Sequence, residues 1–312
     1  MYDQGHTQTA IAEAIGRHKS VVNREIKRNK DQRGSKYDAD LAQRKYDKRL
    51  KSKAKHVKLD EAMRQRVKEG LGAKYSPEQI VGNARRQGLP MVSHETIYKM
   101  VWADKRKGGV LHHDLRHQGR KYQKRGNAYK KRGVIPGRVD ISERPKEVET
   151  RERLGDLEID TIIGKNHKGA IVTINDRKTG YLWMRLLGNR EAAGLAEATV
   201  KALERNKHLL KTITSDNGKE FAAHEDIATQ LGVKFYFARP YHSWERGSNE
   251  NLNGLIRQYI PKGTDFTTLD DEFVKFVQDQ LNNRPRKRHN FESPSQVLNR
   301  LSNLAGEVAF VA

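Results

Sequence analysis

The sequence predicts two basic, all-helical domains followed by an α/β domain built on a mixed five-stranded sheet. Three observations support this prediction. Residues 1–150 hold 37 Lys and Arg against 18 Asp and Glu, a net charge of +19, whereas residues 151–312 carry +3. Two helix–turn–helix patterns lie in the basic half. In the second half, strand-like and helical hydrophobic periods follow the order β-β-β-α-β-α-β-α. We expect domains at 1–55, 56–135 and 150–305.

The overall composition excludes several classes of protein. The 312 residues carry a net charge of +22 and contain no cysteine, which excludes disulfides, cysteine-ligated zinc or iron–sulfur centres and thiol catalysis. No apolar run approaches the roughly 18–20 residues of a membrane span, and no basic-then-apolar leader opens the chain. We therefore expect a cytoplasmic, nucleoid-associated protein whose partner is a polyanion, most simply double-stranded DNA.

The first helix–turn–helix pattern spans residues 8–28. Ala12, Gly16 and Val22 have the required spacing, because a small residue must lie where the helices meet and a glycine must allow the turn. Ile11, Ala12 and Ile15 share one helical face, and the apolar residues Val21, Val22 and Ile26 follow. The alternative is an ordinary amphipathic helix pair. The side chains expected to face DNA are Arg17, His18, Lys19, Ser20, Asn23, Arg24 and Arg28.

The second helix–turn–helix pattern runs from Ser76 to about Trp102. Ser76 to Gln79 form a capping-box start with proline at the first helical position, and Gly88-Leu89-Pro90 ends that helix. Ser93 can cap the next helix, which is expected to present His94 and Lys99 to DNA. Its expected packing residues are Ile97, Tyr98, Val101 and Trp102.

A basic stretch at residues 105–133 follows, with eleven Lys and Arg and one acid. We interpret its C-terminal end as a linker that follows DNA phosphates, and the alternative is a solvated surface run. His113 and His117 are expected to face DNA or solvent rather than to bind a metal, because neither cysteines nor suitably placed acids accompany them.

The elements predicted in the α/β half are short and clearly bounded. Three strands with short connections predict an antiparallel meander, and two further strands alternate with helices. The expected strands are 157–163, 170–174, 181–187, 212–214 and 233–237, and the expected helices are 191–206, 220–231 and one from 243 or 244 to 259.

Three carboxylates occupy informative positions in this order of elements. Asp160 lies in the first strand, Asp216 ends the fourth strand, and Glu250 lies on the last helix, with 33 residues between the last two. Three close carboxylates repel one another, and a divalent cation removes that repulsion. Two Mg²⁺ ions, for which Mn²⁺ can substitute, would clamp an in-line phosphoryl transfer.

Several other acids compete with this set. Glu158 and Asp156 lie two and four residues before Asp160, and Glu158 shares the strand face of Asp160. Asp176 is expected to shape a turn, and Glu220 to occupy a helix start. Glu245 points about 140° away from Glu250 on a helix.

Four segments carry a resemblance to a known family: GDLEIDTIIG at 155–164, TITSDNGKEF at 212–221, RGSNENLNGLIRQY at 246–259 and LNNRPRKR at 281–288. Over residues 7–300 the chain resembles bacterial insertion-sequence transposases of the "IS thirty" family, within the RNase H-like, retroviral-integrase-like superfamily. The resemblance implies that Asp160, Asp216 and Glu250 form a DDE triad in an RNase H-like core. It also implies that the N-terminal helices bind the terminal inverted repeats.

The resulting hypothesis is a Mg²⁺-dependent transposase that cleaves a strand at the element end and joins the freed 3′-hydroxyl to DNA. Paired ends imply a homo-oligomer, most simply a dimer. Lys219, Arg246, Asn253 and Arg257 are candidate phosphate or metal-shell neighbours, and Arg284 to Arg288 a candidate DNA-backbone contact. The alternatives are a helix–turn–helix regulator with a catalytically silent core and a plain RNase H-like nuclease.

Overall fold

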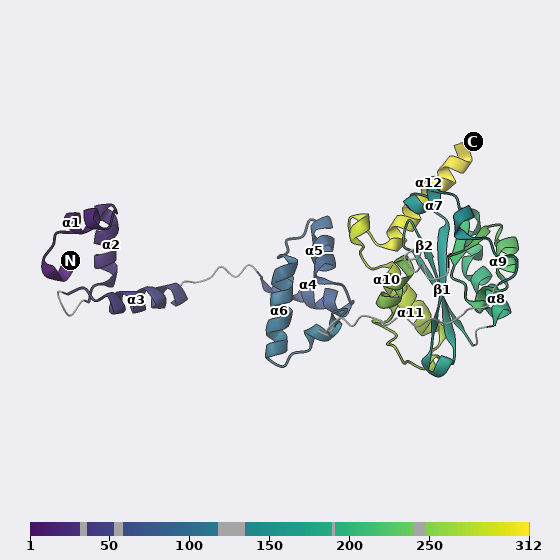
Figure 1. The fold of residues 1–312 in the computed structure, drawn as a ribbon, viewed down its shortest axis with the longest axis horizontal. Coiled ribbons are helices and arrows are strands. Elements are labelled where there is room, and N and C mark those ends of the chain that lie inside the picture. Colours follow the sequence, from purple (N-terminus) through teal and green to yellow (C-terminus); the bar gives the residue numbers. More distant parts are fainter. Residues whose placement is uncertain (32–35, 53–58, 118–134, 189–190, 240–246, 312) are drawn as a thin grey trace. The chain divides into compact units, whose positions relative to one another are not determined.

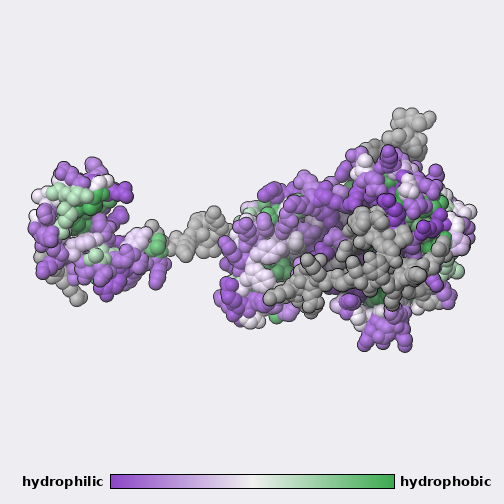
Figure 2. Space-filling model, in the orientation of Figure 1, coloured by the Kyte–Doolittle hydropathy of each residue, from purple (hydrophilic) through white to green (hydrophobic). Residues whose placement is uncertain are grey.

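A computed structural model divides the chain into two units, residues 1–58 and 59–312 (Figure 1). The structure describes residues 1–31, 36–52, 59–117, 135–188, 191–239 and 247–311. The side chains of Ser248, Glu250 and residues 304–311 lie outside that description. The visible surface is mostly hydrophilic (Figure 2). None of the described helices combines the length and apolar character that crossing a membrane requires.

The first unit is a helix–turn–helix with a short apolar core. Its helices are α1 (Gln8–Ala14), α2 (Lys19–Asn29) and α3 (Ala39–Ser52), after a 3-10 turn, η1 (Tyr2–Gln4). The Thr7 hydroxyl caps α1, and Gly16 adopts a φ of +61° that allows the predicted turn. Ala12, Val22 and Ile26 are buried together, as the spacing predicts.

Two apolar residues of this unit do not join its core. Ile15 is 54% exposed and Val21 is 43% exposed, although both belong to the apolar pattern of the helix–turn–helix. Consecutive helical residues point about 100° apart, and Val22 already faces the core in place of Val21. Ile15 is the C-cap of α1, where the chain turns away.

The second unit begins with three helices that pack around their own apolar cluster. They are α4 (Glu61–Gly72), α5 (Pro77–Arg86) and α6 (His94–Arg106). The predicted capping box is present: Gln79 N–H donates to Ser76 Oγ at 3.3 Å, and Ser76 N–H donates to Gln79 Oε1 at 2.9 Å. Ile97 and Val101 are fully buried. Tyr98, predicted to pack, is instead exposed because its side of α6 faces a cleft described below.

A mixed five-stranded sheet follows in the order β3-β2-β1-β4-β5. Antiparallel pairing joins β3, β2 and β1, and parallel pairing joins β1, β4 and β5, which confirms the predicted meander and the mixed sheet. The strands are β1 (Asp156–Ile163), β2 (Ala170–Asp176), β3 (Leu182–Leu187), β4 (Thr212–Ser215) and β5 (Lys234–Phe237).

Helices cover both faces of this sheet (Figure 1). One face holds α8 (Ala192–Leu203) and α9 (His224–Leu231), and the other holds α10 (Gly247–Ile256) and α11 (Asp271–Asn282). A short α7 (Glu147–Thr150) precedes β1, and α12 (Pro294–Val311) ends the chain. The sequence predictions include no residue range for α4, α7, α11 or α12.

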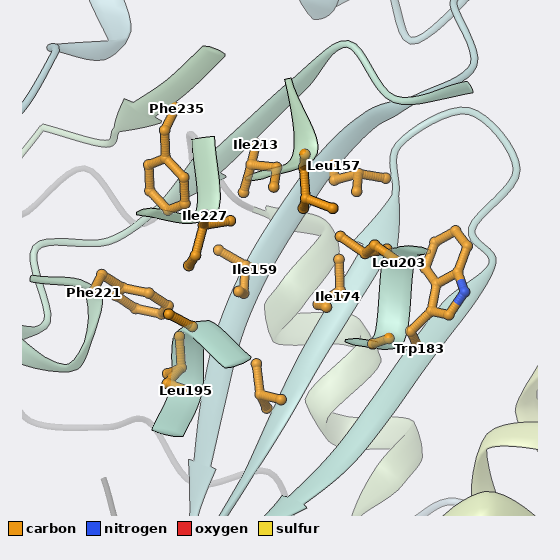
Figure 3. Close-up of a cluster of buried hydrophobic side chains, with 14 of the residues drawn as sticks. Leu157, Ile159, Ile174, Trp183, Leu195, Leu203, Ile213, Phe221, Ile227 and Phe235 are labelled. Carbon is orange, nitrogen blue, oxygen red and sulfur yellow. The ribbon is translucent and has the colours of Figure 1, made fainter. Parts of the chain in front are cut away.

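The faces of β1 determine which residues reach which helices. Leu157 and Ile159 point into the core with Phe221 and Ile227 on the α8 and α9 side (Figure 3). Because strand side chains alternate, Asp156, Glu158, Asp160 and Ile162 share the opposite face, and Ile162 packs with α10 and α11. This alternation places three acids of β1 on the sheet face that α10 and α11 cover, and Asp160 among them contacts α10. The predicted division into domains at 1–55, 56–135 and 150–305 stays a prediction.

Candidate active site

Asp160 on β1 and Asp216, directly after the end of β4, lie at the same level of two neighbouring parallel strands. The ladder between β1 and β4 pairs Glu158 with Thr214, and the two aspartates each follow two residues later. Adjacent strands are about 4.8 Å apart, so the two carboxylates emerge side by side. Both residues are half-buried. The Gly218 N–H donates to Asp216 Oδ1 at 2.9 Å and fixes the orientation of that carboxylate.

Helix α10 reaches the same place from the opposite side of the site. Asn253 Nδ2 donates to Asp160 Oδ2 at 3.0 Å, and Leu252, Leu255 and Ile256 anchor the helix in the core. Glu250 lies three residues before Asn253, so its Cα belongs to the same side of the helix. The Glu250 side chain itself lies outside the described residues.

The chemistry of the donor set suits a hard divalent cation. Asp160 and Asp216 supply carboxylate oxygens, and the Asn253 Oδ1 beside them is buried with no hydrogen-bond partner in the described part of the chain. Mg²⁺ prefers such oxygen ligands together with water. Among the described residues, no group of three or more His, Asp or Glu is arranged to hold a metal ion.

The competing acids next to Asp160 have structural partners. Glu158 is fully buried, and its Oε1 accepts from Arg177 Nη1 at 2.6 Å. Asp156 accepts from Thr212 Oγ1 at 2.8 Å and pairs with Arg153 at 2.9 Å. These contacts assign both acids to the support of the sheet.

Asp176 has the local role that its position predicts, whereas Glu220 precedes the start of α9 at His224 and contacts the strand β1 instead. The Asp176 carboxylate accepts from the Thr179 N–H and hydroxyl, both at 2.7 Å, and so closes the turn after β2. Burial raises the pKa of Asp176. Glu220 lies in the short 3-10 helix η6 (Lys219–Phe221) and accepts from Thr161 Oγ1 at 2.8 Å. Glu245 and Arg246 lie outside the described residues.

The predicted DNA contacts of the helix–turn–helix patterns are solvent-accessible. The exposed residues are Arg17, His18, Lys19, Ser20, Asn23, Arg24, Arg28, His94 and Lys99. His113 and His117 are exposed as well. Their assignment to DNA stays a prediction.

Arg257 is placed differently from those residues. It is half-buried, and its guanidinium donates to the carbonyl oxygens of Ile163, Ile260 and Pro261 at 3.3–3.5 Å. Burial lowers its pKa. These contacts hold the end of α10 against the end of β1, a role that the sequence spacing does not reveal.

The loop after Asp216 depends on a residue that sequence reasoning missed. Arg138 donates to Asn217 Oδ1, and Asn217 Nδ2 donates to the Ala238 carbonyl oxygen at 2.6 Å. The two bonds tie Asn217, the residue after Asp216, to Arg138 in the segment ahead of α7 and to Ala238 directly after β5. Because 79 positions separate Arg138 from Asn217, no local pattern could have indicated the contact.

Comparisons with known proteins identify the family of this chain. A family described as an integrase core domain matches residues 152–243, and a helix–turn–helix domain matches residues 1–29. A transposase for insertion sequence element IS4351 of Bacteroides fragilis is 57% identical over 98% of this chain and 94% of the relative. A transposase for element IS30C of Escherichia coli is 36% identical over 93% of this chain and 78% of the relative. The chain belongs to the IS30 family of insertion-sequence transposases.

Family membership confirms the resemblance and the predicted fold class, an integrase-like α/β core preceded by helix–turn–helix units. A transposase with an integrase core belongs to the polynucleotidyl transferases, and its helix–turn–helix domain implies that it binds DNA. Among solved structures, the catalytic core domain of BIV integrase aligns with 48% of this chain and 97% of that chain, at 17% identity and a TM-score of 0.38.

Asn253 offers the first test of this site. Replacing it by alanine removes the hydrogen bond to Asp160 and is expected to lower strand-cleavage activity by about 10- to 100-fold, the usual effect of losing a partner that orients a ligand. The measurement is the initial rate of cleavage across a Mg²⁺ titration. The matched change Asn206→Ala, on the far side of the sheet, should leave the rate unaltered. Equal rates in the two variants would show that Asn253 does not position Asp160.

Proposed function

We propose that the chain is a DDE transposase that cuts and joins DNA at the ends of its insertion sequence, with Asp160, Asp216 and Glu250 as the catalytic carboxylates. The observation that carries the proposal is the adjacency of Asp160 on β1 and Asp216 directly after β4, with α10 tied to Asp160 through Asn253. Asp160 and Asp216 are thus neighbours within a basic protein, and Glu250 belongs to the helix whose Asn253 bonds to Asp160.

Different residues of the chain have different roles in the proposed reaction. Asp160, Asp216 and Glu250 would hold two Mg²⁺ ions, and the bound cations would supply activation of a water or 3′-hydroxyl and charge stabilisation of the leaving oxygen. Asn253 and the Gly218 N–H hold the aspartates in place. The exposed residues of α2 would read base edges in the terminal repeats, since the N-terminal part of a recognition helix reaches the major groove.

Two copies of the chain on paired element ends complete the proposal, because joining requires both ends together. The competing possibility is a regulator whose integrase core is catalytically silent. That regulator would bind the same repeats and leave the DNA intact.

Metal dependence separates the two possibilities. The test incubates the full chain with DNA carrying the repeats that flank its coding sequence, and follows nicked and joined products on a denaturing gel. Products are expected with Mg²⁺ or Mn²⁺ and should be absent in EDTA. A bound cation offsets the repulsion between the carboxylates and supplies the chemistry of the phosphoryl transfer. Retention of the DNA on a native gel in EDTA serves as the control for binding. Binding without products in either metal would favour the regulator.

A further inference from the structure

A cleft of about 690 Å³ lies within the second unit, outside the carboxylate site. Its walls come from the start of α5, one face of α6, the α10 residues Asn251, Leu252 and Leu255, and the segment 284–288. Seven Lys and Arg line it, against one acid, Glu78, which already pairs with Lys287 at 2.6 Å. The cleft therefore carries a large excess of positive charge.

The arginines at alternate positions of segment 284–288 form a gradient of burial along this cleft. Arg284 is 2% exposed, Arg286 is half-buried and Arg288 is exposed. Among the described residues, no salt bridge joins Arg284, Arg286 or Arg288 to a carboxylate, although Asp176 and Glu158 lie close enough to attract the Arg288 guanidinium. Arg284 donates instead to the amide oxygens of Gln79 and Gln258, at 3.0 and 2.7 Å.

Most donors of the two outer arginines remain available to a ligand. A guanidinium has five N–H donors. Arg286 uses Nη2 for the Leu281 carbonyl oxygen at 3.0 Å, and Arg288 uses Nε for His289 Nε2 at 3.0 Å. Burial together with the neighbouring arginines lowers the pKa of Arg284 to about 10 and that of Arg286 to about 9. An anion in the cleft would relieve this repulsion.

Two glycines allow guanidinium groups to lie directly on the backbone here. A Cβ at Gly180 would lie 2.3 Å from Arg288 Nη2, and a Cβ at Gly254 would lie 2.3 Å from Arg116 Nη2. Arg116 also donates to Asn251 Oδ1 and to the Asn251 carbonyl oxygen, at 2.9 and 3.3 Å. The cations are thus held in defined positions along the walls.

The cleft and the carboxylates share α10. Asn251, Leu252 and Leu255 line the cleft, while Asn253 of the same helix contacts Asp160. A helix with its side chains is about 10–12 Å across, so a ligand in the cleft lies within roughly that distance of the acids. The cleft is too small for a duplex and suits a short run of one sugar–phosphate backbone. Tyr98 and Trp102 of α6 offer aromatic surface beside it.

We propose that this cleft binds the sugar–phosphate backbone of one strand of the DNA substrate, with Arg286 and Arg288 contacting its phosphates. The identity of the ligand rests on the proposed function, which makes DNA the substrate of the adjacent carboxylates. Backbone contacts carry no sequence information, so the cleft positions any DNA while the helix–turn–helix units select it.

The test measures the salt dependence of DNA binding by the full chain in EDTA, where no phosphodiester chemistry occurs. A labelled duplex lacking the element ends is titrated with wild type, Arg286→Gln, Arg288→Gln and the double variant. Each substitution is expected to reduce the slope of log K against log salt by about 0.9, and the double variant by about twice that. The matched control is Lys207→Gln, an exposed cation in the 3-10 helix that follows α8.

Conservative and competing variants keep the proposal falsifiable. Arg286→Lys retains the charge and should keep a slope close to that of wild type. Slopes that match Lys207→Gln in both glutamine variants would overturn the inference, as would equal losses in Arg286→Lys and Arg286→Gln. A parallel titration with tripolyphosphate tests for a small-anion site. If the glutamine variants lose tripolyphosphate binding while their DNA binding is unchanged, the inference is overturned as well. Metal-dependent cleavage by the wild type is scored separately, so failure here leaves the proposed function standing.

Discussion

Replacing Asp160 by asparagine is expected to reduce strand cleavage and joining by about a thousandfold or more, because metal-ion catalysis contributes several kcal/mol to such reactions. Asparagine has nearly the same volume and can still bond to Asn253. Asp160 is half-buried, so the fold should tolerate the loss of its charge. Asp216→Asn is expected to give the same loss, and the double variant no more than either, since residues that act as a unit are not additive.

The measurement compares product formation with DNA binding for each variant. Binding in EDTA and the thermal unfolding midpoint should stay close to those of wild type. Glu225→Gln, the same chemical change at an exposed position of α9, is the matched control and should keep full activity. Cleavage by Asp160→Asn at the rate of Glu225→Gln would remove Asp160 from the catalytic set.

The hydrophobic periodicity of the sequence predicted those elements that are determined by residues close together in the chain. All five strands and the capping box of α5 were predictable because each depends on alternation or on residues three apart. No residue range was predicted for helix α11, and neither were the contacts by which it completes the sheet. Its Asn282 and Gln278 satisfy the backbone of Leu182 and Met184 on the edge strand β3, about a hundred positions away. Such amide caps of an edge strand leave no periodic signal.

The carboxylate site divides in the same way. Period two placed Glu158 and Asp160 on one face of β1, and the position of Asp216 at a strand end indicated its neighbourhood to Asp160. What separates Glu158 from Asp160 is the partner of each. Arg177 pairs with Glu158 and Asn253 with Asp160, and both partners come from other elements. A single sequence does not reveal which acid is neutralised by the fold.

Replacing Glu158 by glutamine is accordingly expected to lower the free energy of unfolding by about 3–5 kcal/mol, the usual cost of removing one partner from a buried ion pair. Both side chains of the pair are at most 1% exposed, and Arg177 would keep one carboxylate, Glu149, at 3.4 Å. That acid is 63% exposed and also pairs with Arg144, so it compensates poorly for the lost charge. The measurement is urea-induced unfolding followed by the fluorescence of the buried Trp183.

Two comparisons isolate the buried charge as the cause of this loss. Glu152→Gln, at an exposed position ahead of β1, should change the free energy of unfolding by no more than about 0.5 kcal/mol. The double variant Glu158→Leu with Arg177→Met should recover most of the loss, because replacing both partners by apolar groups removes the unpaired charge. At temperatures where it stays folded, Glu158→Gln should still cleave DNA, in contrast to Asp160→Asn. A stable but inactive Glu158→Gln would mean that Glu158 belongs to the catalytic carboxylates and that its ion pair with Arg177 opens when DNA binds.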